Sequence, residues 1–253
     1  MIELYSSSSN LGDNLGLTAL AVLTPCRVHM YDDVGCRSVS PIFQGVCEVV
    51  HDNGSPTTHG PQSNATTHIG LPTTLRHLIQ AGAQGHPALP VMRLTDEEIA
   101  KAREFLKPYP NPCVIKCSPQ VTDARTPPLD IMTQIVRQNP GVSFLSFGLS
   151  KNHAKHNFAY VTTPGIHDFF DLPIREEAAI YHLVGRYIGV DSGTYHLALA
   201  VGCNCVVLCQ EDHPTYRWSL FHYGPECWVG LTPKVWYHHW NKQFDLTPIG
   251  LYQ

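Results

Sequence analysis

The segment Tyr187–Thr194 (YIGVDSGT) combines residue types that can hold an anion where a strand passes into a helix. We expect an apolar strand to end at Val190 and a helix to begin at Gly193. The first backbone N–H groups of such a helix have no intrahelical acceptor, and with the helix dipole they favour an anion such as pyrophosphate. Gly193 would let this backbone approach a ligand closely, and His196 in the first turn could lean toward the same anion.

The same residues also fit a purely structural arrangement. Asp191 or Ser192 would then cap the helix, Gly193 would relieve a tight turn, and His196 would be a satisfied interior side chain. The residue types alone leave both interpretations open.

A longer stretch, Tyr187 to Leu208 (YIGVDSGTYHLALAVGCNCVVL), resembles the signature of the heptosyltransferase family of lipopolysaccharide synthesis. In that signature an Asp-Ser/Thr-Gly turn, a His three residues later, a small-residue helix, a Gly and a final strand follow in order. The resemblance implies that the segment binds the diphosphate of a nucleotide sugar. It also implies a GT-B-like α/β fold, with two Rossmann-like domains of parallel sheets and a cleft between them. The residues it implies for this binding are Gly12, Asp191, Ser192, Gly193, Thr194 and His196.

The resemblance also implies a Gly-Asp pair after the first strand, which Gly12 and Asp13 supply. By resemblance Asp13 is the catalytic base, because a carboxylate in the cleft can take the proton of an acceptor hydroxyl that attacks the anomeric carbon. Inversion at that carbon would follow. Asp13 could instead cap the first helix, where free N–H groups and the dipole would lower its pKa and weaken it as a base.

Other polar residues have both functional and ordinary interpretations. Lys116, near the end of the first strand of the second half, and Lys151, after the strand 142–147, stand where a cation could neutralise a leaving diphosphate, so we include Lys116 among the nucleotide-sugar-binding residues. Both could equally be surface lysines. Ser6–Ser9 could offer hydroxyls to a substrate or form a polar turn. The aromatic C-terminal segment, which holds all four tryptophans, could stack on a sugar or simply close the core.

Cysteine and histidine spacing argues against a metal site. Cys203, Cys205 and Cys209 alternate along one expected strand and do not converge with His213 on one ion, and no CxxC pair occurs. In apolar strands these cysteines, with Cys113 and Cys117, behave as small hydrophobic residues, so we expect free thiols, a reducing cytoplasmic location, and neither metal nor cofactor.

Strands and helices alternate along the whole chain, which predicts α/β architecture with parallel sheets covered on both faces. Thr95 and Glu98 form a capping box that predicts a helix start. The prolines Pro108, Pro110 and Pro112 then mark a boundary between an acceptor-side domain, 1–110, and a nucleotide-sugar-binding domain, 111–253. Expected strands are 1–5, 27–31, 47–50, 113–117, 142–147, 158–162, 187–190 and 205–209. Expected helices are 12–23, 72–81, 95–106, 129–138, 175–184 and 193–201, with a surface loop at 51–68.

Composition narrows the classes of partner. A formal charge of −4, from 17 basic and 21 acidic residues, gives no general positive field for nucleic acid or anionic lipid. No run approaches the ~20 apolar residues that a membrane span needs, so we expect no transmembrane segment.

The sequence therefore predicts a metal-independent glycosyltransferase that takes a sugar from a nucleotide-diphosphate donor. The acceptor hydroxyl could belong to a glycan, a lipid-linked glycan, a protein or a modified nucleic acid. Two alternatives stay open: a non-catalytic module that binds nucleotide sugars, and a sugar-nucleotide epimerase on the same fold.

Overall fold

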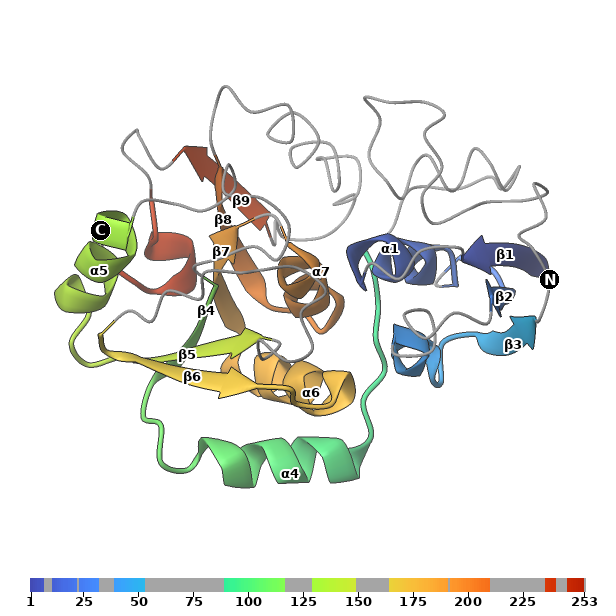
Figure 1. The fold of residues 1–253 in the computed structure, drawn as a ribbon, viewed down its shortest axis with the longest axis horizontal. Helices are drawn as coiled ribbons and strands as arrows, with labels where there is room; N and C mark the ends of the chain where they lie inside the picture. Colours follow the sequence, from blue (N-terminus) through green and yellow to red (C-terminus); the bar gives the residue numbers. More distant parts are fainter. Residues whose placement is uncertain are drawn as a thin grey trace.

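The computed structural model describes residues 1–6, 11–21, 23–31, 39–52, 89–116, 129–148, 164–190, 192–209, 235–239 and 245–252. These residues form a three-stranded and a six-stranded sheet, and every strand pair in both is parallel. Helices pack between and around the two sheets (Figure 1). The α/β class with parallel sheets is confirmed.

The first sheet, of strand order β1-β2-β3, belongs to the N-terminal part of the chain. Leu4, Val28 and Met30 are fully buried on one face and pack with the helix α1 in the hydrophobic core. Charged side chains occupy the other face, where Arg27 pairs with Glu3 and Glu48. The elements are β1 (Ile2–Ser6), α1 (Leu11–Ala21), β2 (Cys26–Tyr31), the 3-10 turn η1 (Ser40–Phe43) and β3 (Glu48–Asp52).

The second sheet has the strand order β6-β5-β4-β7-β8-β9. Its first strand in the chain, β4, lies inside the sheet; the chain adds β5 and β6 on one side, then crosses to add β7, β8 and β9 on the other. This is the strand order of the Rossmann fold. The side on which successive strands are added changes between β4 and β7, which we call the reversal point. The strands are β4 (Pro112–Lys116), β5 (Ser143–Gly148), β6 (Ile166–Phe170), β7 (Arg186–Val190), β8 (Asn204–Cys209) and β9 (Val235–His239).

Both faces of the second sheet are covered. Consecutive residues of its central strands are apolar, and their side chains point alternately to one face and to the other. Cys113 and Ile115 pack with the helix α5 and with the C-terminal residues 246–251. Val114, between them, packs on the opposite face with α6 and α7. The remaining elements are α4 (Asp96–Leu106), α5 (Leu129–Gln138), α6 (Ile174–Val184), α7 (Gly193–Ala200) and the 3-10 turn η4 (Thr247–Ile249).

The two strands of the second sheet that the sequence did not predict are its edges, β6 and β9. An edge strand has one neighbour and needs less apolar surface, and β6 accordingly has no fully buried residue. All other described strands and helices were predicted to within about three residues at each end. The helix expected at 72–81, the strand at 158–162 and most of the loop at 51–68 lie outside the described residues.

Helices α1 and α7 pack side by side and join the two sheets into one hydrophobic core (Figure 1). The segment between the two sheets crosses both helices and bonds to each of them. Val91 N–H donates to Thr18 Oγ1 of α1 at 2.9 Å, and Met92 N–H donates to the Ala200 carbonyl of α7 at 3.0 Å. This segment, the linker, therefore connects the two helices near their C-terminal ends.

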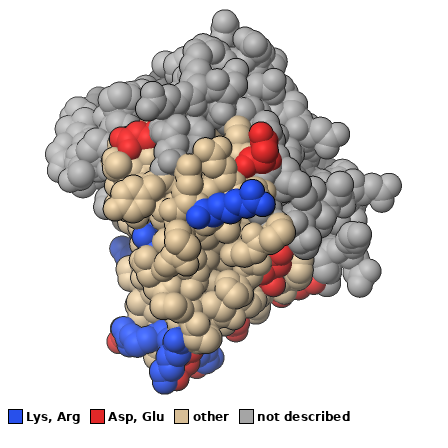
Figure 2. All heavy atoms as spheres, turned by 90° about the vertical axis from the view of Figure 1, so that its left-hand side faces the viewer, with Lys and Arg blue, Asp and Glu red and all other residues tan. Residues whose placement is uncertain are grey.

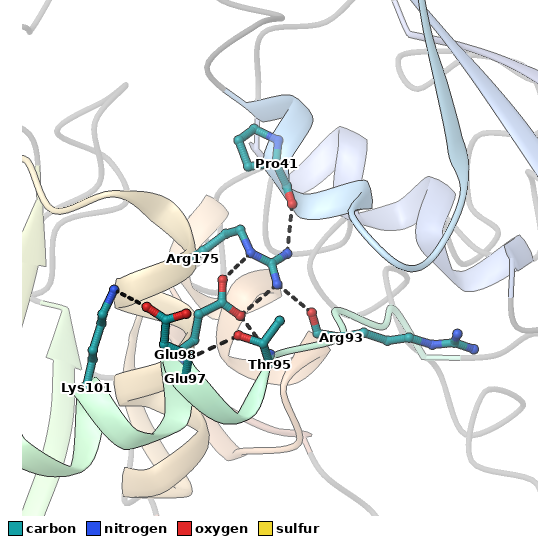
Figure 3. Close-up of polar contacts among 7 residues, drawn as sticks. All are labelled: Pro41, Arg93, Thr95, Glu97, Glu98, Lys101 and Arg175. Atoms are coloured by element: carbon teal, nitrogen blue, oxygen red, sulfur yellow. Dashed lines mark hydrogen bonds and ion pairs between the residues drawn. The ribbon is translucent and has the colours of Figure 1, made fainter.

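Arg175, which is 9% exposed, makes a second fastening at the start of α6 (Figure 3). Its Nη1 donates to the Pro41 carbonyl of η1 at 2.9 Å, and its Nη2 donates to the Arg93 carbonyl at 2.7 Å. Nε and Nη2 also donate to the Glu98 carboxylate at 2.5 and 2.8 Å. One guanidinium thus connects the N-terminal part, the linker, α4 and α6.

Glu98 serves two purposes in this arrangement. It completes the predicted capping box, accepting from Thr95 N–H at 2.8 Å while its own N–H donates to Thr95 Oγ1 at 3.3 Å. The hydrogen bonds from Arg175 hold the pKa of the Glu98 carboxyl below its ordinary value. Helix α4 precedes the predicted domain boundary at residue 110 but packs against α6, which follows it. The boundary stays a prediction.

We expect Arg175→Ala to lower the free energy of unfolding by about 3 kcal/mol, because it leaves the Glu98 carboxylate and two carbonyls without their donor. Urea denaturation at pH 7 measures this, and the exposed Arg103→Ala on α4 is the matched control. The deficit should narrow as the pH falls below 4.5, where protonation of Glu98 also weakens the ion pair in the unmodified chain. Equal losses in the two variants would contradict this role.

Candidate functional site

The carboxyl ends of β4 and β7 form the place where a Rossmann sheet binds its ligand. The two strands are direct neighbours, with Lys116 opposite Gly189 in register. β7 ends at Val190, and α7 begins three residues later at Gly193. The predicted anion-binding turn therefore lies at the point where the strand order reverses.

Among the described side chains, the residue at the cap position of α7 makes no capping hydrogen bond. Ser192 occupies the cap position with extended backbone, but its hydroxyl makes no capping bond. Ser192 Oγ instead shares a hydrogen bond with Thr194 Oγ1 at 2.7 Å, and Thr194 Oγ1 shares another with Tyr187 Oη at 3.1 Å. The alternative in which Asp191 or Ser192 caps the helix stays open, because Ser192 makes no capping bond through its side chain and Asp191 lies outside the described residues.

The first turn of α1 is in contact with the first turn of α7. An added Cβ on Gly193 would lie 2.9 Å from Leu11 Cβ and 3.5 Å from the Gly12 nitrogen. An added Cβ on Gly12 would lie 2.7 Å from Cδ2 of His196. The fold thus brings together the two motifs, Gly12-Asp13 and Ser192-Gly193-Thr194, which are about 180 residues apart in the sequence.

Asp13 is the third residue of α1, because this helix begins at Leu11. It lies in the first turn rather than at the cap position, and both its role as a base and its interaction with the helix start stay predictions, because its side chain lies outside the described residues. Ser6 bonds through its hydroxyl to Asn14 and is fully buried, so it ties β1 to α1. Ser7–Ser9 and Lys151 lie outside the described residues.

The contact places two helix N-termini at one spot. Each helix end carries a partial positive charge from unsatisfied N–H groups, equivalent to roughly half an elementary charge. Two such ends in contact raise each other's electrostatic energy, and an anion between or beside them lowers it. Their convergence at the reversal point of the sheet therefore favours an anionic ligand more strongly than either helix does alone.

Lys116 is buried beneath this region rather than free on the surface. Its side chain is 5% exposed, and Nζ donates to the Phe147 carbonyl at the end of β5 at 2.7 Å. Its predicted contact with a nucleotide sugar stays a prediction.

The sequence reasoning missed a buried acid near Lys116. Glu177 Oε1 and Tyr181 Oη lie one turn apart on α6, and both atoms are buried. Burial raises the pKa of Glu177, which Tyr181 and Lys116 partly offset, and burial followed by the Glu177 charge raises that of Tyr181. The signal in the sequence was the spacing of four residues between Glu177 and Tyr181, which places both side chains on the same face of the helix.

His196 is 6% exposed, and its ring lies 4.0 Å from that of Tyr195, measured between centroids. It packs against Gly12, as the short distance above shows. This places the imidazole at the contact between α1 and α7. Its predicted role in nucleotide binding is compatible with this place and stays a prediction.

Within the described ranges, no group of three or more His, Cys, Asp or Glu side chains is arranged to hold a metal ion. Cys113, Cys203 and Cys205 are buried free thiols, as predicted. Burial raises the pKa of Cys113 to about 12, so this thiol stays protonated. The side chains of Cys117, Cys209 and His213 lie outside the description.

Charges on the described surface are mixed in sign. Figure 2 shows the side where α5 lies in Figure 1, and its Lys and Arg side chains stand near Asp and Glu without forming a continuous basic area. Across the part of the chain that the structure describes, no helix has both the length and the apolar character to cross a bilayer.

The fold matches solved glycosyltransferases. A family 9 glycosyltransferase from Veillonella parvula superimposes with a TM-score of 0.65 at 11% identity, covering 94% of this chain and 85% of that one. ADP-heptose lipopolysaccharide heptosyltransferase II of E. coli gives 0.66 at 13% identity, covering 98% and 95%. The iron-containing heptosyltransferase TibC of enterotoxigenic E. coli, in complex with ADP-D-β-D-heptose, gives 0.58 at 15% identity, covering 92% and 62%.

No protein-family profile and no curated protein sequence matches this chain. The identities to the solved structures are low, so the similarity establishes the fold. The chain has the GT-B-type fold of the family 9 glycosyltransferases, as the resemblance in the sequence implied.

We expect Glu177→Gln to stabilise the protein at neutral pH. A buried acid with a raised pKa loses stability as the pH rises from 4.5 through that pKa, and a neutral amide avoids this loss. Urea denaturation at pH 4 and pH 7.5 measures the effect, with the exposed neighbour Glu176→Gln as control. A gain confined to the higher pH supports the burial of this carboxyl; a loss at both values contradicts it.

Proposed function

We propose that this protein is a glycosyltransferase that moves a sugar from a nucleoside-diphosphate donor to a hydroxyl acceptor with inversion. The observation that carries the proposal is the contact between the first turns of α1 and α7 beside the reversal point of the second sheet. The GT-B-type fold and the ADP-heptose complex of the neighbour TibC support a nucleotide-sugar donor.

In the proposed reaction the donor diphosphate lies against the first turn of α7. Asp13, directly after Gly12, accepts the proton of the acceptor hydroxyl as that oxygen bonds to the anomeric carbon. The bond between this carbon and the diphosphate oxygen breaks, and the nucleoside diphosphate leaves with the electron pair. The amides and dipole of α7 stabilise the charge that develops on the leaving group, and the buried Lys116 ammonium adds to the positive potential.

The proposal assigns the chemistry to these protein groups without a metal. Because TibC contains iron, metal analysis of the purified protein and assays with and without a chelator belong with every activity measurement. Activity that a chelator abolishes and ferrous iron restores would overturn this part of the proposal.

We expect Asp13→Asn to lower the transfer rate by about 10²–10⁴-fold while the affinity for ADP changes less than about twofold, because the amide cannot accept the proton. Calorimetric titration with ADP, and ADP release from a panel of sugar nucleotides that includes ADP-heptose, measure the two quantities. Asp96→Asn, on the first turn of α4, is the matched control.

Three outcomes separate the proposal from its alternatives. Binding without turnover, unchanged in Asp13→Asn, would indicate a non-catalytic binding module. A new sugar nucleotide formed without an acceptor would indicate an epimerase. Absence of binding by any nucleoside diphosphate or its sugar would overturn the anion site itself.

A further inference from the structure

Two glycines face each other's helices across the junction of α1 and α7. Gly12 on α1 leaves the space that the imidazole of His196 fills, since an added Cβ would stand 2.7 Å from Cδ2 and 3.0 Å from Nε2. Gly193 on α7 leaves the space that Leu11 fills, since an added Cβ would stand 2.9 Å from Leu11 Cβ. The arrangement is reciprocal: each helix supplies one glycine and one side chain that packs on the other.

Neither close approach has an easy route of relief. The His196 ring is buried and packs on Tyr195, which is fully buried, so the ring has little room to turn away. The atom of Leu11 that faces Gly193 is its Cβ, which is fixed to the backbone. An added methyl group at either glycine would therefore push the two helices apart rather than rotate a side chain.

A glycine within the first turn of α1 needs a reason, because alanine favours helix by about 1 kcal/mol per residue. The contact with His196 supplies that reason for Gly12. Gly12 immediately precedes Asp13, and Gly193 opens the turn that receives the donor in the proposed function. The two contacts therefore fix the distance between the proposed base and the proposed donor site.

We infer that Gly12 and Gly193 are positioning residues, whose missing side chains let His196 and Leu11 set the spacing between Asp13 in the first turn of α1 and the first turn of α7. This inference rests on the proposed function for its catalytic consequence. Catalysis by positioning is sensitive to small displacements, and a shift of about 1 Å can reduce a rate on the order of 10²-fold. A separation of the two helices at this contact is a displacement of that scale.

A double-mutant cycle on Gly12 and His196 tests the inference. The four proteins are the full chain, Gly12→Ala, His196→Ala and the double variant, and Gly141→Ala is the control because an added Cβ there meets nothing within 4 Å. Each is measured for thermal unfolding, for ADP affinity by calorimetry, and for kcat and KM with the donor that the sugar-nucleotide panel identifies.

We expect Gly12→Ala to lower the unfolding temperature and to reduce kcat by about tenfold or more. In the His196→Ala background the same substitution should change kcat less than about twofold, because the ring that it displaces is gone. Gly141→Ala should leave kcat unchanged. The dependence on His196 is a readout that general damage to α1 would not show.

The outcomes distinguish this inference from the proposed function. Equal effects of Gly12→Ala in both backgrounds would overturn the contact, whatever the activity. If Gly12→Ala lowers the unfolding temperature only when His196 is present, while kcat does not change, the contact stabilises the fold but does not position catalytic groups. This result would overturn the positioning role. If ADP and the whole panel fail to bind the unmodified chain, the proposed function and the positioning role both fail, while the coupling in unfolding temperature still decides whether the contact exists.

Discussion

The contact between the first turns of α1 and α7 is the constraint on which the rest of this structure depends. It joins residues about 180 positions apart in the sequence, and it brings the N-terminal turns of two helices together. Two positive helix ends in contact are unfavourable without a compensating anion. The same contact is sterically specific, because only glycine at positions 12 and 193 permits it.

The scaffold around this contact keeps the two helices in register. The linker bonds to α1 through Val91 and to α7 through Met92, and the hydrophobic core continues from one sheet to the other between them. At some distance, Arg175 connects η1, the linker and α4 to the start of α6. The two halves are thus held at two places, by close packing at α1 and α7 and by one buried guanidinium.

Most of the central fold could be predicted from the sequence, because buried parallel strands such as β4 and β8 have continuous apolar runs at their centres and the helices between them have clear ends. The capping box of Thr95 and Glu98 is entirely local and was predicted correctly. The edge strands β6 and β9 were not predicted as strands, since an edge needs fewer buried residues and Val235–His239 is rich in aromatic and histidine side chains. The pattern of strands and helices does not predict that Gly12 of α1 contacts the ring of His196 of α7.

The candidate site was predictable only in part for the same reason. Motif order brought Gly12 and Gly193 to attention, and the structure places them together. Lys116 was interpreted either as a diphosphate-binding cation or as a surface lysine; it is buried and bonded to the Phe147 carbonyl, so the surface interpretation is wrong. Glu177 was missed because a charged residue in a helix is normally on the exposed side.

A crystal structure of the protein with ADP tests the central claim most directly. The account predicts diphosphate oxygens within about 3 Å of the Gly193 and Thr194 amides, with the ligand beside the contact between the first turns of α1 and α7. ADP bound at any other place, with the first turn of α7 in contact with protein groups alone, would contradict it.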